Sequence, residues 1–168
     1  PTRLFDLPNH QLDNAAQDGM FVTKVNGKWD KISTSEFVGL VKEYSNALIG
    51  MGVQEGDRVG LVSTNRFEWN VMDFAIQGVG AIVVPLYPNI SSKDYIYIFN
   101  DAQMKLAVVG TDELYSKING VRSEIPSLEN LYCFDLVEGM DHWSKLLEKR
   151  SDENDAVVEE RKSKVKPE

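Results

Sequence analysis

The sequence predicts an α/β fold: a doubly wound, mainly parallel sheet of about four strands flanked by helices, with an N-terminal β-hairpin. Between residues 33 and 150, helix-like segments and short apolar segments alternate at nearly even spacing. This is the order that successive βαβ units produce. In the segment 58–63, the apolar residues Val59, Leu61 and Val62 lie on both faces, which is typical of parallel strands covered by helices on both sides.

We divide the chain into three parts on this pattern. Residues 1–32 are expected to form an N-terminal arm and hairpin, because Asn26-Gly27 between two strand-like segments suits the positive φ angles of a type I′ turn. Pro8-Asn9 is interpreted as a break in the arm. Residues 33–150 are expected to form the α/β subdomain, and residues 151–168 a charged linker or helix.

Local signals place the elements of the subdomain. Ser33 with Glu36, and Ser91 with Asp94, have the spacing at which a side chain caps the first turn of a helix. Asn65 is expected to cap a largely buried helix that ends near Val79. Strands are predicted at residues 58–63, 81–86, 106–109 and 131–134, and further helices at residues 111–118 and 142–149.

Composition excludes several classes of protein. The chain has 168 residues, about one domain, and a formal charge of −8 from 26 acidic and 18 basic residues. Since nucleic-acid binders neutralise phosphates with a basic surface, nucleic acid is not expected as a partner. Cys133 lies in an apolar segment and is expected to be a buried strand thiol, so nothing indicates an oxidising compartment. With no apolar stretch of ~20 residues, the expected location is the cytoplasm.

No catalytic, cofactor-binding or metal-binding residue is predicted. The glycine pairs at residues 50–52 and 78–80 follow helices and precede strands, the wrong order for a phosphate loop, so they are interpreted as helix stops. His10 and His142 lack metal-ligand spacing and are assigned to surface or packing roles.

One region remains as a candidate site. Residues 63–66 follow one predicted strand, and Tyr87-Pro88 follow the next. The carboxyl ends of parallel strands meet at the edge where doubly wound sheets bind ligands. We therefore expect Asn65, Arg66, Trp69 and Tyr87 to form a cleft wall or a domain interface.

Five segments have a recognisable order and spacing: residues 27–29, 32–37, 56–61, 65–69 and 80–88. Together they resemble the start of AMP-forming acyl-CoA synthetases, over roughly residues 2–150. Within that superfamily, the Asn-Arg-x-Glu-Trp form at residues 65–69 and the Leu-Tyr-Pro form at residues 86–88 are most similar to long-chain fatty-acid–CoA ligases, although Phe67 replaces a usual proline.

The resemblance implies a two-step ligase whose full-length form uses ATP, Mg²⁺ and CoA. The fatty acid forms an acyl-adenylate and pyrophosphate, and CoA then displaces AMP. The family's phosphate loop, Tyr-Gly-x-Thr-Glu segment, ribose-binding aspartate and mobile lysine have no counterpart in these residues, so we expect this part alone to be inactive. Its expected partners are fatty acid, ATP, CoA and the rest of the chain. Peripheral contact with the inner face of the membrane and self-association stay open.

Three alternatives remain. The chain could belong to another adenylating ligase, acting on an aryl, short-chain or amino acid. It could be a stand-alone flavodoxin-like binding module, which would need a hydroxyl- or glycine-rich phosphate cradle at the first strand–helix turn. A purely structural interaction domain is the third.

Overall fold

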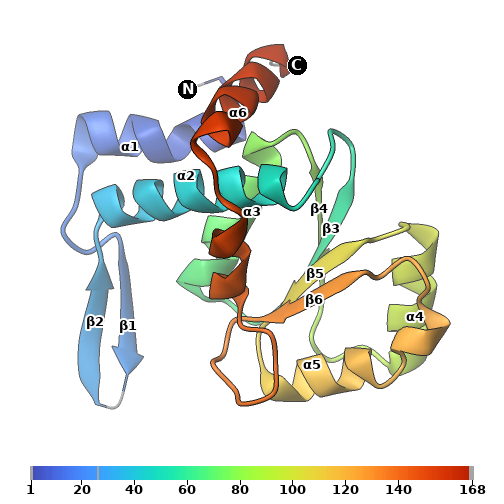
Figure 1. Ribbon diagram of the computed structural model, residues 1–168. Helices are drawn as coiled ribbons and strands as arrows, with labels where there is room; N and C mark the ends of the chain where they lie inside the picture. Colours follow the sequence, from blue (N-terminus) through green and yellow to red (C-terminus); the bar gives the residue numbers. More distant parts are fainter. Residues whose placement is uncertain (1, 26, 167–168) are drawn as a thin grey trace.

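The computed structural model describes residues 2–25 and 27–166. Helices and strands alternate through its central part, and the two ends of the described chain lie close together (Figure 1). The elements in chain order are η1 (Leu4–Asp6), α1 (Leu7–Ala15), β1 (Phe21–Val25), β2 (Lys28–Ile32), α2 (Thr34–Gly50), β3 (Arg58–Val62), α3 (Phe67–Gly78), β4 (Ile82–Leu86), α4 (Ser92–Asp101), β5 (Leu106–Val109), α5 (Asp112–Asn119), η2 (Arg122–Glu124), β6 (Asn130–Cys133), η3 (Trp143–Lys149) and α6 (Asp152–Lys164).

The four-stranded sheet is wholly parallel and has the order β4-β3-β5-β6, which confirms the predicted fold class. β3 pairs with β4 on one side and with β5 on the other; Val59, for example, lies opposite Val83 and Leu106. β4 is therefore an edge strand. The N–H of Ile82 donates to Asp57 O toward β3. Because backbone N–H groups alternate in direction along a strand, positions 83 and 85 are directed away from β3. Pro85 therefore sits at a position where a missing N–H is tolerated.

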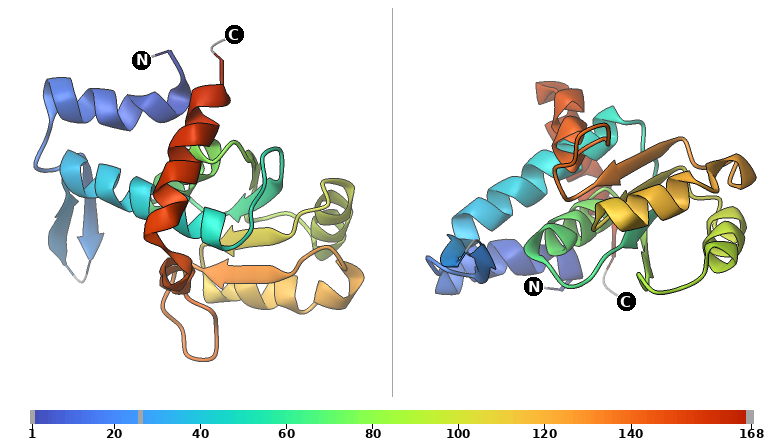
Figure 2. Two further views of the ribbon diagram at one scale, coloured as in Figure 1. Left: turned by 45° about the horizontal axis from the view of Figure 1, so that its top comes forward. Right: turned by 90° about the horizontal axis from the view of Figure 1, so that it is seen from below.

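Two apolar layers cover the two faces of this sheet. Helices α2 and α3 lie on one side and α4 and α5 on the other (Figures 1 and 2). Alternate strand residues enter opposite layers because successive side chains of a strand point to opposite faces. The α2–α3 layer holds Val59, Leu61, Val108 and Tyr132, and the α4–α5 layer holds Val62, Ala107, Val109, Leu131 and Cys133.

The sequence signals for helix ends are largely confirmed. Ser33 and Ser91 each form the full reciprocal cap with Glu36 and Asp94. The glycine pairs do end helices: α2 ends at Gly50 and α3 at Gly78, followed by positive φ angles at residues 52 and 80. No residue of α3 is exposed, in agreement with its apolar circumference.

The N-terminal arm differs from expectation. Pro8 is not a break but the second residue of α1. Its missing N–H costs nothing there because N–H groups of a first helical turn have no intrahelical acceptor. The hairpin is present, with Val25 opposite Lys28 and φ of +80° at Gly27; Asn26, the other predicted turn residue, lies outside the described residues.

The C-terminal part is helical and packed. The helical segment predicted at residues 142–149 is a 3₁₀ helix over residues 143–149. Beyond it, α6 lies against α2, where Asn46 donates to Ser151 O at 2.8 Å and to Asp155 Oδ1 at 2.7 Å. The linker alternative is thus not what residues 152–164 adopt, and residues 167–168 lie outside the described part. The division into three domains stays a prediction.

Across the described residues, no helix combines the length and apolar character that a membrane crossing requires.

Candidate ligand cleft at the carboxyl edge of the sheet

A cleft of about 550 Å³ lies where β3 and β4 end. Three of the four predicted residues border it: Asn65, Trp69 and Tyr87. The segments that carry these residues converge because β3 and β4 are parallel neighbours, so that the backbone leaves both strands at the same edge of the sheet. The full lining is Ser63, Thr64, Asn65, Trp69, Pro85, Leu86, Tyr87 and Pro88.

Tyr87 is anchored through its backbone and free at its side chain. Its carbonyl accepts a hydrogen bond from the Tyr95 hydroxyl at 2.9 Å. Tyr95 is fully buried, and that burial raises the pKa of its phenol to about 12. The Tyr87 side chain is 78% exposed. An exposed aromatic ring on a fixed backbone is well placed to contact a ligand or another domain.

Asn65 does not cap the following helix, so that interpretation is wrong. Helix α3 begins at Phe67, its N-cap is Arg66, and no side chain caps it. Instead Asn70 in the next turn donates to Arg66 O at 3.1 Å. Asn65 is exposed and lines the cleft, where its side-chain amide is accessible to a ligand.

Arg66 does not line the cleft. Its guanidinium donates to Gly110 O at 2.9 Å, to Asp135 Oδ1 at 2.8 Å and to both carboxylate oxygens of Glu68. It also lies 5.2 Å from the centre of the Phe134 ring. The hydrogen bond with Glu68, followed by the one with Asp135, raises the pKa of Arg66. Arg66 thus joins the start of α3 to the ends of β5 and β6.

This arrangement fills the place where a doubly wound sheet usually binds a phosphate. The chain leaves β3 toward β4 and β5 toward β6, so the connections diverge between β3 and β5. There, a Cβ on Gly110 would lie 2.5 Å from Ser63 Oγ, and Arg66 bonds the Gly110 carbonyl. The cleft lies one strand away, between β3 and β4.

The cleft combines apolar walls with a small polar rim. Trp69 and Leu86 are partly buried and pack against the core, while Ser63, Thr64 and Asn65 supply hydroxyl and amide groups. No charged side chain lines it within the described residues. Such a surface suits an uncharged or apolar group rather than a metal–triphosphate.

The residues given structural roles behave as expected. Cys133 is fully buried, and burial raises the pKa of its thiol. His142 contacts Phe134 O at 3.0 Å through its ring and caps η3; His10 lies on the surface. In the part of the chain that the structure describes, no three His, Cys, Asp or Glu residues are grouped as a metal site.

A second cavity, of about 280 Å³, lies between α1, α2 and α6. Phe5, Val41, Phe74 and Val158 contribute its apolar lining. Lys42, Asp155, Glu159 and Lys162 supply its charged lining, and none of the lining residues that the structure describes comes from a strand.

Sequence reasoning missed the partners of Arg66. Gly110 and Asp135 are 44 and 69 residues away along the chain, and neither lies in a motif. A lone arginine beside a strand end is the available signal, and it does not identify which distant groups it bonds.

Comparisons with known proteins agree with this geometry. The profile of the family described as "AMP-binding enzyme" matches residues 10–168. The long-chain-fatty-acid–CoA ligase FadD15 of Mycobacterium bovis is 30% identical over 107 residues, which cover 64% of this chain and 18% of that protein. An uncharacterized protein of Mycobacterium tuberculosis, Rv1549, is 28% identical over 100 residues, covering 60% of this chain and 55% of that protein.

A crystal structure of a long-chain-fatty-acid–CoA ligase from Archaeoglobus fulgidus has the same fold. The TM-score is 0.72 at 19% identity, over 90% of this chain and 31% of that one. The chain therefore spans about a fifth of the FadD15 ligase and about a third of the archaeal one. Because the family profile covers nearly the whole chain, this chain belongs to the AMP-binding enzyme family.

Proposed function

We propose that these residues are the N-terminal part of a long-chain fatty-acid–CoA ligase. The observation that carries this proposal is the meeting of two family-like segments, residues 65–69 and 86–88, at a single cleft. The 30% identity to FadD15 supports the long-chain assignment. In the proposed parent, the fatty-acid carboxylate attacks the α-phosphorus of ATP and releases pyrophosphate. The CoA thiolate then attacks the acyl carbonyl, and AMP leaves.

The part played by residues 1–168 is to form a wall, not to perform the chemistry. The cleft offers hydroxyls and one amide but no cation, so a magnesium–triphosphate does not fit it, and we assign no step through ATP, Mg²⁺ or CoA to these residues. Its apolar side, with Trp69 and Leu86, suits an acyl chain or an apolar surface of the remaining chain. We infer that residues 1–168 alone are inactive.

ATP–pyrophosphate exchange tests this proposal. The full-length parent and the chain 1–168 are each assayed with acetate, octanoate, palmitate and benzoate. We expect exchange by the parent, fastest with palmitate, and none by 1–168. Fastest exchange with benzoate or acetate contradicts the long-chain assignment, and palmitate-dependent exchange by 1–168 contradicts the inactivity of this part.

Within the parent, Tyr87→Ala tests the cleft. The exposed ring makes little contribution to folding, so we expect unchanged stability and a higher KM for palmitate. Tyr97, which lies on α4 outside the cleft, is also exposed. Tyr97→Ala is therefore the matched control and should leave KM unchanged. Equal KM values for the two variants would show that the cleft does not take part in binding the acyl chain.

A stand-alone binding module is the second candidate. It is favoured by the similarity to Rv1549, a short protein of which 100 aligned residues make up 55%. The filled crevice at Gly110 argues against the flavodoxin-like form of this module, because a phosphate would need that space. Calorimetric titration of 1–168 with flavin mononucleotide should show no heat of binding.

Location and assembly are further proposals. We propose a cytoplasmic protein with peripheral membrane contact. Self-association of 1–168 is proposed through the uncovered side of β4, where Ile82 is 50% exposed. The outward-facing Pro85 removes one donor from this edge and should keep the association weak. Sedimentation velocity that shows a monomer at every concentration contradicts self-association.

A further inference from the structure

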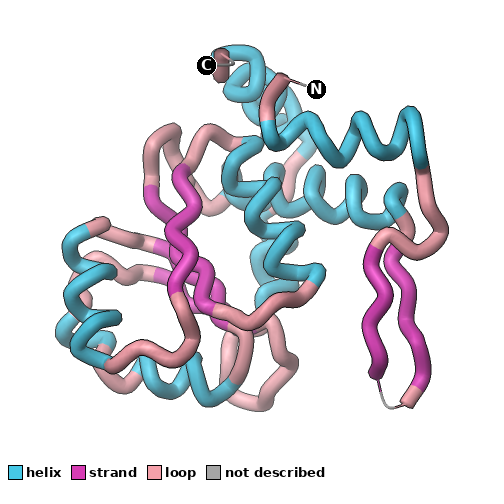
Figure 3. The backbone as a smooth tube through the Cα atoms, turned by 180° about the vertical axis from the view of Figure 1, so that it is seen from behind, coloured by secondary structure: helices cyan, strands magenta, loops and turns pink. Residues whose placement is uncertain are grey.

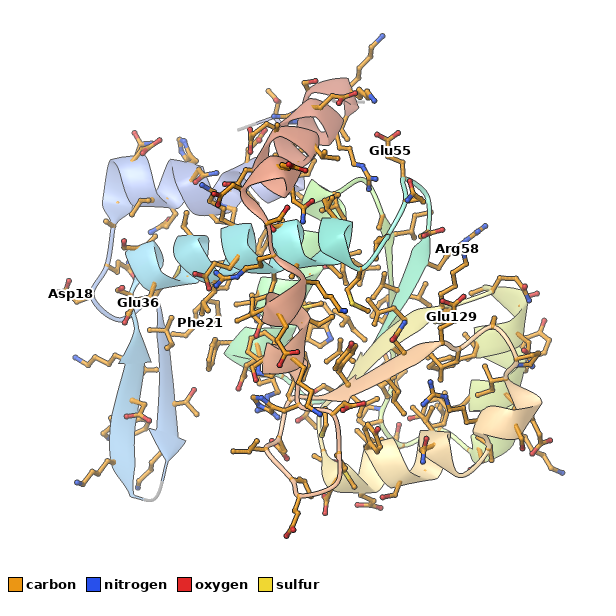
Figure 4. All side chains as sticks on the ribbon, in the orientation of Figure 1. Asp18, Phe21, Glu36, Glu55, Arg58 and Glu129 are labelled. Atoms are coloured by element: carbon orange, nitrogen blue, oxygen red, sulfur yellow. The ribbon has the colours of Figure 1, made fainter. Side chains whose placement is uncertain are left out.

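The β1–β2 hairpin has two unlike faces. Phe21 and Ile32 are directly opposite each other and share one face. The ring of Phe21 lies 5.0 Å from that of Phe37 in α2 and 6.5 Å from that of Phe67 in α3. Figure 4 shows Phe21 at the base of the hairpin, beside the core. This face therefore attaches the hairpin to the domain.

The other face carries Val22, Lys24, Trp29 and Lys31, which we call the lysine–tryptophan face. Val22 lies opposite Lys31, and Lys24 lies opposite Trp29. Trp29 is 65% exposed and Val22 is 49% exposed. Lys24 Nζ is 5.8 Å from the centre of the Trp29 ring, so the charge and the aromatic surface form one patch.

The charge of this face is opposite to that of the whole chain. Residues 21–32 hold three lysines and one aspartate in a chain of net charge −8. The aspartate, Asp30, pairs with Thr23 on the opposite face. The hairpin stands apart from the helices (Figure 3); five strand residues rise about 17 Å. That length exceeds the screening length of about 8 Å at physiological salt, so the acidic domain has little effect on Lys24 and Trp29 near the tip. Val22 and Lys31 lie one pair from the base, where Figure 4 shows Asp18 and Glu36.

We propose that the lysine–tryptophan face binds an anionic phospholipid surface. Lysines near such a surface gain from its negative potential, and tryptophan prefers the interface between lipid and water. Val22, beside them, suits an apolar phase that a nucleic acid does not offer. This inference names a surface for the membrane contact proposed above, and it does not depend on the ligase activity because it is argued from the hairpin alone.

Co-sedimentation with vesicles tests the inference. The chain 1–168 is mixed at low salt with vesicles of phosphatidylcholine alone, or of phosphatidylcholine and phosphatidylglycerol in equal parts. We expect binding to the mixed vesicles only, and release as salt rises. Each lysine should contribute about fivefold, so Lys24→Gln/Lys31→Gln should weaken binding by about 25-fold.

The matched control is Lys93→Gln/Lys105→Gln, which makes the same charge change at exposed lysines outside the hairpin. It should bind like the unmodified chain. Brominated lipid should quench tryptophan emission of the unmodified chain but not of Trp29→Phe, since Trp143 is buried and Trp69 half-buried.

Three results would overturn the inference: no binding to the mixed vesicles, an equal loss in both double variants, or binding of oligothymidylate in place of vesicles. Circular dichroism of each variant establishes that the fold is retained. Because the assay contains no ATP, CoA or free fatty acid, its outcome is separate from that of the exchange assay.

Discussion

Replacing Asn46 by alanine should loosen helix α6 from the rest of the domain. Asn46 lies in α2 and is 6% exposed. Its side chain donates to Ser151 O and Asp155 Oδ1, at 2.8 and 2.7 Å, and accepts from Ser151 N at 3.0 Å. These bonds join segments 105 and 109 residues apart along the chain, so no local structure replaces them.

The size of the effect follows mainly from these three bonds; a fourth, donated by Asn154 Nδ2 to Asn46 Oδ1, is longer at 3.3 Å. A neutral hydrogen bond contributes about 1 kcal/mol and one to a charged group roughly 1.5–3 kcal/mol. Ser151 is exposed and Asp155 half-buried, so water can satisfy part of what Asn46 leaves. We therefore expect Asn46→Ala to lower the free energy of unfolding by about 3 kcal/mol, a fall in Tm of roughly 6–12 °C.

The assay is thermal and urea unfolding followed by circular dichroism, with Asn70→Ala as the matched control. Asn70 also lies in a helix but makes one hydrogen bond, to Arg66 O within its own first turns; its loss should cost under about 1 kcal/mol. Hydrogen exchange should rise first in α6. Equal losses of stability in the two variants would refute the reasoning.

The same interaction has a pH dependence. The hydrogen bond from Asn46, followed by that from Lys42, lowers the pKa of Asp155 below its usual 3.8. A carboxyl group whose pKa is lowered by folding stabilises the fold fully at a pH above its pKa in the unfolded chain. That stabilisation is lost as the pH falls through its pKa in the folded chain. The stability difference between Asn46→Ala and the unmodified chain should therefore be complete at pH 7 and narrow below pH 3.8.

Three further changes have distinct expected outcomes. In α2, Gly39→Ala should stabilise by about 1 kcal/mol, whereas Gly50→Ala should destabilise, because its Cβ would lie 1.8 Å from Lys149 O; opposite shifts in Tm check this, and shifts of one sign would contradict it. Arg66→Lys should lower urea-unfolding stability by about 2–4 kcal/mol, since a lysine cannot bridge its partners; no loss would show the network to be unimportant. Pro85→Val restores an outward N–H on β4 and should increase self-association in sedimentation velocity; an unchanged monomer fraction would argue against that edge.

The sequence was a good guide wherever a signal is local or periodic. The segment 58–63, apolar on both faces, predicted a covered parallel strand because burial on both faces removes polar positions, and residues 59–62 are indeed buried. Ser33 and Glu36 predicted a reciprocal cap because it is formed within one turn. The fold class rests on such signals.

Other features depend on contacts that one segment cannot reveal. Pro8 was interpreted as a break, although the first turn of a helix accepts proline. Asn65 was assigned a cap that the structure does not form, because α3 begins later, at Phe67. The cleft could be placed from strand order, but Arg66 was assigned with its neighbours to a cleft wall or domain interface, since its distant partners Gly110 and Asp135 were not visible.

Arg66 and Asn65 are consecutive, and this adjacency couples two parts of the molecule. The backbone that carries the cleft rim is held by a guanidinium whose partners, Gly110 and Asp135, lie beyond β5 and β6. One of these partners, Asp135, follows β6, the strand at the opposite edge of the sheet from β4. The rim of the cleft is thus anchored across the width of the sheet through a single ion pair.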